Sequence, residues 1–273
     1  MSPARHGLRL SDVGLSYADG KVALSTLDLS IAPGECVAII GPSGAGKTSL
    51  LHLLASQLRP SQGQVELLGQ APWALSARQR QKLRSQIGLI QQSPPLPAKQ
   101  RVITAVLAGK LGQWSTPKSL LSLLYPLDPA GATAALSQLD LAEKLYQRCD
   151  QLSGGQLQRV AIARTLYQQP QLILADEPVS AMDPVLASHT LGVLNQYAHG
   201  HGCTLVASLH AVELALAHFS RVIGLRDGRI VFDQAAGTIS QADLDALYAN
   251  QQLQSSHASP APTPPALWQV PRC

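Results

Sequence analysis

A short glycine-rich stretch constrains this chain more than any other part of its sequence. Positions 41–48 read GPSGAGKT, which fits the pattern GxxxxGK[ST]. The apolar run at 35–40 predicts a buried strand directly before it, and the residues from about Lys47 to Ser56 predict a helix directly after it. A strand, a tight glycine turn and a helix in this order indicate an α/β fold with the turn at one edge of a sheet.

This turn has the chemistry of a phosphate-binding loop. Its glycines let the backbone curl so that several N–H groups point at one anion, and the following helix adds the positive end of its dipole. We expect Lys47 to reach the β- and γ-phosphates of ATP and the Thr48 hydroxyl to bind Mg²⁺. The expected nucleotide ligands are Gly41, Pro42, Ser43, Gly44, Ala45, Gly46, Lys47, Thr48 and Ser49.

Two adjacent carboxylates end a second predicted strand. Leu172 to Ala175 is apolar and is followed by Asp176 and Glu177. Buried carboxylates repel each other and lose hydration unless a cation compensates them. Because Mg²⁺ accompanies a nucleotide, we expect Asp176 to hold the metal and Glu177 to polarise the attacking water as general base. A solvent-exposed acidic strand end is the alternative, which the presence of both motifs disfavours.

A second anion-binding element precedes that strand. Positions 152–156 read LSGGQ and lead into the helical sequence LQRVAIARTL. Ser153 can cap this helix, and Gly154 and Gly155 let a phosphate approach the backbone closely. One ATP needs a single phosphate-binding element. The second such element therefore indicates a site for a nucleotide that is held by another copy of the chain. An ordinary capped helix start is the alternative.

The rest of the sequence predicts three further regions. Residues 8–31 alternate apolar and polar side chains, which is typical of antiparallel strands. Residues 101–168 are mostly helical in pattern, with a loop expected around 115–128. Strand–helix alternation then resumes, and residues 220–233 predict a closing hairpin. The tail at 251–273 is rich in Ser, Ala and Pro and predicts disorder, although Trp268 within it would suit a docking anchor.

The bulk composition excludes several classes of protein. A net charge of +4 is too weak to indicate nucleic-acid binding, and the basic residues around 78–84 predict a solvated helix face. The cysteines are widely spaced and form no CxxC pair, so reduced thiols are expected. We find neither a secretory signal pattern nor an apolar run of about 18 residues. A transport role would therefore need a membrane channel from another chain.

Taken together, these motifs resemble the ABC ATPase family, over roughly residues 8–233. The resemblance implies a P-loop NTPase (RecA-like) α/β core with an N-terminal antiparallel β subdomain and an inserted α-helical signature subdomain. It assigns the core and β subdomain to 8–92 and 169–250, and the helical subdomain to 93–168. Ser153, Gly154, Gly155 and Gln156 would form the signature loop, which closes over the γ-phosphate of ATP held by a second copy.

The same resemblance implies roles for four further residues. Tyr17 would stack on adenine, and Gln92 would sense Mg²⁺, act in catalysis and contact the permease. Gln91 is adjacent, so this assignment could differ by one position. Asp183 would belong to the D-loop, and His210 would be the switch histidine that contacts the γ-phosphate.

A narrower resemblance points to the phosphonate-importer ATPases of bacteria. It rests on the sequences VLAGKLG, ASLHAVELAL and VIGLRDGRIVFD. It implies a peripheral protein on the cytoplasmic face of the inner membrane, beneath permease subunits fed by a periplasmic solute-binding protein. Gln91, Pro94, Pro95 and Met182 depart from the family pattern, which puts the detail of coupling in doubt.

Three alternatives stay open at this point. The cargo could be another small solute, such as an amino acid or phosphate. The chain could be an ABC protein of DNA repair or translation, although it has one cassette and no long coiled coil. A P-loop kinase or GTPase is the third alternative, in which LSGGQ and His210 would have no role.

Overall fold

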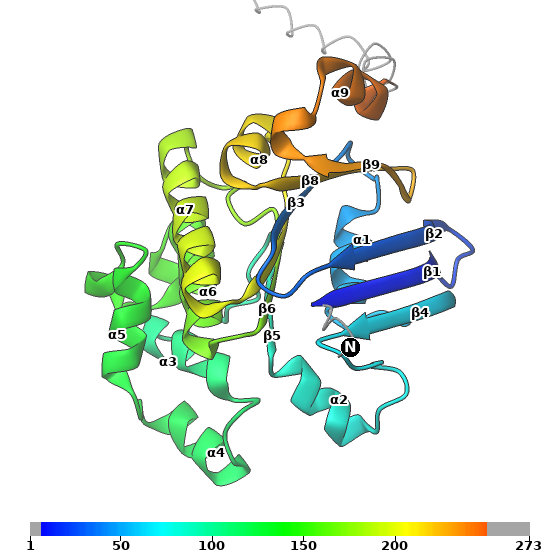
Figure 1. Cartoon of the computed structure of the whole chain (residues 1–273). Coiled ribbons are helices and arrows are strands. Elements are labelled where there is room, and N and C mark those ends of the chain that lie inside the picture. Colours follow the sequence, from blue (N-terminus) through cyan, green and yellow to red (C-terminus); the bar gives the residue numbers. More distant parts are fainter. Residues whose placement is uncertain (1–6, 250–273) are drawn as a thin grey trace, which may run out of the picture.

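The computed structural model describes residues 7–249, which form two β-sheets with helices on both faces of the larger one (Figure 1). The larger sheet has the strand order β5-β6-β7-β3-β8-β9 and is parallel except for the β8–β9 pair. The smaller, antiparallel sheet has the order β2-β1-β4. The strands are β1 (Leu8–Ser16), β2 (Val22–Ile31), β3 (Cys36–Ile40), β4 (Gln62–Leu67), β5 (Ile87–Ile90), β6 (Leu172–Asp176), β7 (Thr204–Ser208), β8 (Arg221–Arg226) and β9 (Arg229–Ala235).

The core lies in two layers, one on each face of the larger sheet. Val37 and Ile39 of β3 pack with β1, β2, β4 and α1 (Lys47–Leu54), whereas Cys36, Ala38 and Ile40 face the helices on the other side. This alternation follows from the period of two in a strand. Because both faces are covered, β3, β6 and β7 are buried along their whole length.

The remaining helices, apart from α2 (Ala77–Arg84), cover the second face and the end of the sheet, whereas Leu83 of α2 packs on the first face with α1. The covering helices are α3 (Val102–Leu107), α4 (Thr116–Leu124), α5 (Pro129–Ser137), α6 (Gly154–Gln168), α7 (Pro184–His201), α8 (Val212–His218) and α9 (Gln241–Tyr248). α6 and α7 lie against the large sheet, and α3, α4 and α5 lie to one side of it (Figure 1). No helix among residues 7–249 is long and apolar enough to cross a membrane.

The predicted fold class is confirmed, and one local expectation was wrong. The residues expected to form a loop around 115–128 contain helix α4. Pro117 lies in its first turn, where proline's missing N–H is harmless and its fixed φ suits a helix. The antiparallel pair at 8–31 and the hairpin at 220–233 are present as predicted. The predicted tail, with Trp268, lies outside the described residues.

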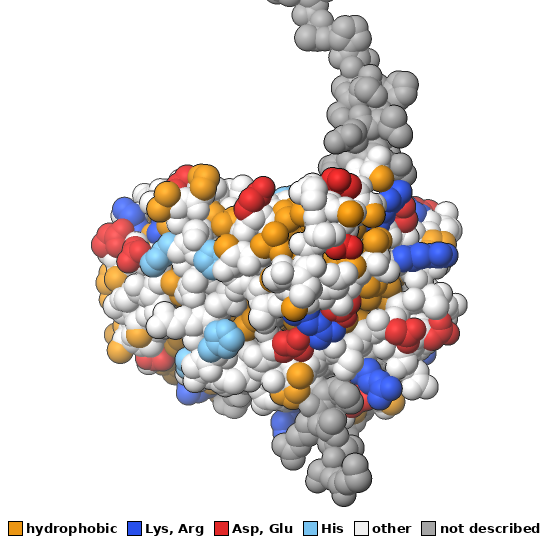
Figure 2. All heavy atoms as spheres, turned by 45° about the horizontal axis from the view of Figure 1, so that its top comes forward, with side chains coloured by type: hydrophobic (Ala, Val, Ile, Leu, Met, Phe, Trp, Pro, Cys, Tyr) orange, Lys and Arg blue, Asp and Glu red, His pale blue; other side chains and the backbone are white. Residues whose placement is uncertain are grey.

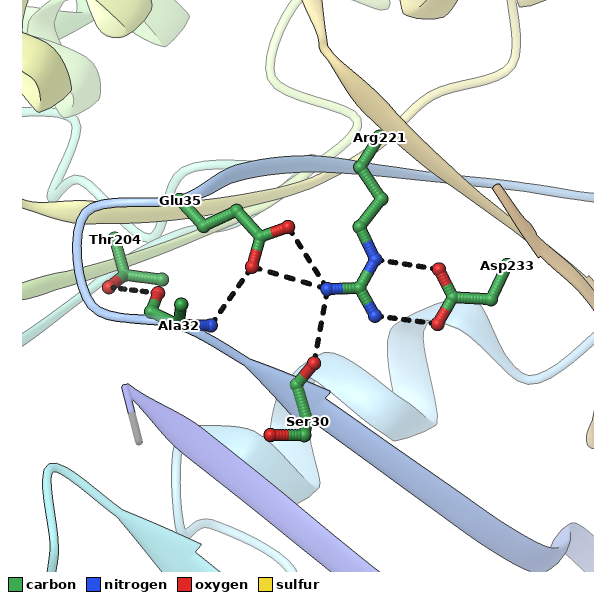
Figure 3. A network of polar contacts seen from close by, with 6 residues as sticks. All are labelled: Ser30, Ala32, Glu35, Thr204, Arg221 and Asp233. Carbon is green, nitrogen blue, oxygen red and sulfur yellow. Dashed lines mark hydrogen bonds and ion pairs between the residues drawn. The ribbon is translucent and has the colours of Figure 1, made fainter. Parts of the chain in front are cut away.

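A partly exposed ion-pair network joins the smaller sheet to the larger one (Figure 3). Arg221 of β8 donates two hydrogen bonds of 2.6 Å to the carboxylate of Asp233 in β9. The same guanidinium donates to Glu35 at 3.0 and 3.2 Å and to the carbonyl of Ser30 in β2 at 3.1 Å. One planar guanidinium therefore ties the turn that leads into β3 to strands β2, β8 and β9.

Candidate functional site

The predicted phosphate loop connects β3 to α1 and requires glycine at two positions. Gly41 has a φ of 153°, and a Cβ there would lie 1.9 Å from the carbonyl oxygen of Leu225. Gly46 has a φ of 101°, and a Cβ there would lie 2.7 Å from the carbonyl oxygen of Ala23. No side chain caps α1, whose N-cap is Gly46, and no acidic residue lies in its first turn. The amides at this helix start therefore remain available to an anion.

Lys47 lies over this loop and is almost completely buried. Its Nζ donates to the carbonyl oxygens of Gly41, at 2.7 Å, and Pro42, at 3.0 Å. Burial lowers the pKa of Lys47, while the nearby carboxylates of Glu177 and Asp176 oppose that shift. The loop thus holds a cation beside the two predicted acidic residues.

The loop forms one wall of a cleft of about 400 Å³. Tyr17 also lines the cleft, and the Tyr17 hydroxyl lies 2.9 Å from the Ser49 hydroxyl. The cleft brings together residues predicted from five separate stretches of sequence. Its lining is Tyr17, Lys21, Val22, Ala23, Ser43, Gly44, Ala45, Gly46, Lys47, Thr48, Ser49, Gln92, Glu177 and His210.

The two carboxylates at the end of β6 occupy different environments. Asp176 is buried and its Oδ1 accepts a 2.6 Å hydrogen bond from the Ser208 hydroxyl. The Ser208 oxygens also accept from the backbone N–H of Glu177, at 3.0 Å for Oγ and 3.2 Å for the carbonyl. Glu177 has a φ of 48°, a left-handed conformation that costs a residue with a side chain about 1–3 kcal/mol. Ser208 thus holds the chain where it turns the Glu177 side chain into the cleft.

The Glu177 carboxylate is held between two other predicted residues. Gln92 Nε2 donates to Oε2 at 2.6 Å, and His210 Nε2 lies 2.6 Å from Oε1. The Glu177 side chain is only 11% exposed, whereas that of His210 is 54% exposed. Gln92, rather than Gln91, places its side chain in the cleft. The three side chains therefore form one cluster opposite the phosphate loop.

The LSGGQ residues lie outside this cleft. Ser153 caps α6, because its Oγ accepts from the N–H of Gln156 and the Gln156 side chain accepts from the N–H of Ser153 at 2.9 Å. A Cβ at Gly154 would meet no atom within 4 Å, so this helix start faces open space among the described residues. The structure therefore shows a second exposed helix N-terminus that does not serve the cleft of its own chain.

The predicted D-loop lies directly beside this second helix start. A Cβ at Gly155 would lie 3.0 Å from the carbonyl oxygen of Ala181. Asp183 caps α7 and accepts from the N–H groups of Val185, at 3.1 Å, and Leu186, at 3.0 Å. In this chain the Asp183 carboxylate is thus engaged in capping and does not line the cleft.

The available oxygen donors suit a magnesium ion that is shared with a nucleotide. Among residues 7–249 no three His, Cys, Asp or Glu side chains lie close enough to hold a metal by themselves. Mg²⁺ commonly takes one or two protein oxygens and completes its shell with phosphate and water. Thr48 in the cleft and the buried carboxylate of Asp176 offer oxygens of that kind.

Two residues that organise the site have no sequence motif of their own. Ser208 ends an otherwise apolar strand, and nothing in the pattern distinguishes it from a packing residue. Gln158 of α6 is 1% exposed and donates through Nε2 to the carbonyl oxygen of Gln91 at 3.0 Å. For Gln158, the signal that the sequence offers is a glutamine among the apolar residues of the predicted helix.

Comparison with known proteins agrees with this geometry. Residues 24–180 match the family model for the ABC transporter. The phosphonates import ATP-binding protein PhnC 1 of Pseudomonas aeruginosa is 67% identical, over 97% of this chain and 99% of that protein. The phosphonates import ATP-binding protein PhnC of Pseudomonas putida is 62% identical, over 95% of this chain and 96% of its own length.

Solved structures share the fold. The ATP-binding cassette MJ0796, in a dimeric post-hydrolysis state with ADP and Pi, is 28% identical with a TM-score of 0.71 and covers 84% of this chain. That match includes 98% of the MJ0796 chain. The fold and the site define a nucleotide-hydrolysing cassette of the phosphate-loop type. The chain belongs to the ABC transporter family, as an ATP-binding, ATP-hydrolysing subunit.

Proposed function

We propose that this chain drives the import of phosphonate, or a related phosphorus oxyanion, through a separate permease. The cargo is supported by relatives that match nearly the whole chain at 62% to 67% identity and are named as phosphonates import ATP-binding proteins. The chemistry is supported above all by one observation. Glu177 lies in the cleft of the phosphate loop, held between Gln92 and His210.

The cleft suggests a role for each group in ATP hydrolysis. The loop amides and Lys47 would bind the β- and γ-phosphates, and Tyr17 would stack on the adenine. Glu177 would accept a proton from the attacking water, while Gln92 and His210 keep its carboxylate in place. Mg²⁺ bound through Thr48, Asp176 and Gln92 would neutralise phosphate charge.

A second copy of the chain would complete each site. Ser153, Gly154, Gly155 and Gln156 present a helix start that faces away from their own cleft. In a head-to-tail dimer this helix start would meet the γ-phosphate bound by the other copy, and Asp183 would lie at the same interface. ATP contacts to both halves would then favour the closed dimer.

The remaining assignments describe how hydrolysis reaches the membrane. We propose a nucleotide-binding core with a β subdomain at 8–92 and 169–250, and a helical subdomain at 93–168. The helical part and Gln92 would transmit closure to permease subunits, and a periplasmic binding protein would deliver the solute to them. In this role the chain would lie at the cytoplasmic face of the inner membrane.

Growth on a single phosphorus source tests the cargo directly. A strain that lacks the gene should not grow on a phosphonate as sole phosphorus source, and should grow normally on phosphate. The wild-type gene should restore growth, whereas Glu177→Gln should not. In the contradicting outcome, the deletion strain would grow normally on every phosphonate tried and grow poorly when an amino acid is the nutrient supplied. That result would replace phosphonate with the amino acid as the proposed cargo.

A further inference from the structure

A long part of the sequence contains no acidic residue. Residues 67–127 have neither aspartate nor glutamate, although the chain has 17 of them. The same stretch contains a substantial share of the basic residues, namely Arg78, Arg80, Lys82, Arg84, Lys99, Arg101, Lys110 and Lys118. The rest of the chain therefore has more acidic than basic residues. Figure 2, turned so that the top of Figure 1 comes forward, shows both signs interspersed there.

Within this stretch, helix α4 has its apolar side turned outward. The side chain buried against the protein is Ser122, whose hydroxyl donates to the carbonyl of Ser119 at 3.2 Å. The leucines point away from the protein, with 61% of Leu120, 52% of Leu121 and 87% of Leu124 exposed. A group of outward-facing leucines is costly in water and marks a surface where a protein or a membrane can dock.

The segment that leads into α4 contacts the end of the basic helix α2. Gln113, three residues before α4, donates through Nε2 to the carbonyl oxygen of Ser85, the C-cap of α2, at 3.2 Å. Both helices lie along the lower edge of the molecule in Figure 1. Arg78 and Lys82 of α2 are exposed. The segment before α4 therefore contacts the end of α2, and both helices have exposed side chains.

Aromatic side chains stand at both ends of α4. Trp114 precedes the helix and lies under the Lys118 ammonium, which is 4.8 Å from the ring centroid. Tyr125 follows the helix and is 70% exposed. The next acidic residue, Asp128, is turned inward. Its carboxylate accepts hydrogen bonds from the N–H of Gly131 and from the Tyr167 hydroxyl, each at 2.9 Å. Outward leucines between an aromatic–lysine pair and a tyrosine are typical of helices that lie in a membrane interface.

We propose that α4, together with the basic residues of α2, rests on the anionic headgroups of the lipid bilayer. Leu120, Leu121 and Leu124 would enter the headgroup region, and Arg78 and Lys82 would attract the anionic lipid. With nine residues, α4 is too short to span a bilayer and would lie in its plane. A lipid surface is favoured over a protein partner because the stretch that contains both helices, residues 67–127, has basic residues and no acidic one. The location at a membrane rests on the proposed transport function.

Flotation of the purified full-length protein with vesicles tests this contact. Vesicles of phosphatidylglycerol in phosphatidylcholine should bind the protein, and vesicles of phosphatidylcholine alone should bind it much less. Leu120→Ser with Leu124→Ser should reduce binding about tenfold. Val231→Ser, which changes an exposed apolar residue on β9, is the matched control and should bind as wild type.

The charge contribution has its own matched pair. Arg78→Gln and Lys82→Gln should each weaken binding about fivefold at low salt, because a basic residue near an anionic surface gains about 1 kcal/mol. Arg229→Gln on β9 should have no such effect. Wild-type protein that does not float, or a leucine double variant that floats like wild type, overturns the proposal.

The ATPase rate in solution, measured on the same samples, separates this proposal from the catalytic one. A normal rate without flotation rejects the lipid contact alone, whereas an absent rate rejects the hydrolytic function. Unchanged flotation of the leucine variant, with loss of its association with the permease in detergent, would assign α4 to the permease instead.

Discussion

The side-chain amide of Gln158 donates a hydrogen bond to the backbone carbonyl of Gln91, with 3.0 Å between Nε2 and O. Gln158 is in α6, two residues after the last signature residue, and Gln91 precedes the glutamine that holds Glu177. This bond therefore joins the helix that would serve the partner's nucleotide to the cluster that would serve the chain's own. Among residues 7–249 the buried Oε1 atom of Gln158 has no hydrogen-bond partner, so the amide contacts its surroundings through its donor.

Two substitutions at Gln158 distinguish this donor from simple packing. Gln158→Leu should lower the free energy of unfolding by only about 1 kcal/mol. It removes one hydrogen bond, which destabilises the fold, and one unsatisfied oxygen, which offsets part of that loss. Gln158→Glu should cost about 3 kcal/mol, since it places a buried carboxylate against a carbonyl. Both should slow ATP hydrolysis while nucleotide affinity stays unchanged, as measured by denaturant unfolding, steady-state kinetics and nucleotide titration. Wild-type turnover in Gln158→Leu would show that the bond has no part in hydrolysis.

Glu177→Gln tests the proposed general base. An amide of the same shape can still contact Gln92 and His210 but cannot accept a proton, so turnover should fall about 10²- to 10⁴-fold. Nucleotide affinity should be retained, and ATP should trap a stable dimer detectable by size-exclusion chromatography. Asp243→Asn, which changes the capping-box carboxylate of α9 outside the cleft, is the matched control and should hydrolyse ATP at the wild-type rate. Hydrolysis by Glu177→Gln near the wild-type rate would remove this residue from the mechanism.

The neighbouring glycines of the signature provide a test of the dimer. Ala at position 154 would meet no atom of its own chain within 4 Å, and it favours a helix by up to about 1 kcal/mol over glycine. Gly154→Ala should therefore preserve or raise the melting temperature. It should nevertheless lower the ATPase rate at least about tenfold if a nucleotide of a second copy approaches this point.

Gly155→Ala provides the contrast, since its methyl group would press on the carbonyl of Ala181 at 3.0 Å. This variant should lose thermal stability as well as activity. Melting curves and ATPase rates of both variants, measured over a range of protein concentrations, make the comparison. A Gly154→Ala protein with unchanged activity at every concentration would argue that no partner nucleotide meets this helix.

The sequence predicted those features that depend on local patterns. Two local patterns specify both the fold class and the cleft: the strand, glycine turn and helix in that order, and the apolar strand before Asp176 and Glu177. Each pattern is encoded over a few neighbouring residues. The orientation of α4 was not predictable in this way. The sequence pattern predicted a loop here, and only packing against the rest of the chain makes Ser122 the inward residue. Ser208 and Gln158 act through partners more than 30 residues away, which no local pattern reveals.

The Arg221 network predicts a stability effect with little direct effect on chemistry. Arg221→Lys keeps the charge but loses the planar fork that binds Asp233 through two nitrogens while a third contact reaches Glu35. Charged hydrogen bonds in such a setting contribute about 1.5–3 kcal/mol, so the free energy of unfolding should fall by about that amount. Arg229→Lys, an exposed position on the next strand, should change it by less than about 0.5 kcal/mol. Equal denaturant midpoints for the two variants would contradict this account.

The buried thiols of Cys36 and Cys203 predict a loss of stability at alkaline pH. Burial raises the pKa of Cys36 to about 11 and that of Cys203 to about 12, from an ordinary value of 9.0. Above pH 9 the unfolded chain therefore releases protons that the folded chain keeps, so the stability present below pH 9 declines until the folded thiols themselves ionise. At about pH 10 each thiol should lower the free energy of unfolding by about 1.4 kcal/mol.

The double variant Cys36→Ala with Cys203→Ala tests this. It is less stable than wild type near neutral pH, because its side chains are smaller. Between about pH 8 and about pH 10, however, its free energy of unfolding should fall by about 2–3 kcal/mol less than that of wild type. Parallel pH profiles of the two proteins in denaturant unfolding would show that these thiols do not titrate on unfolding.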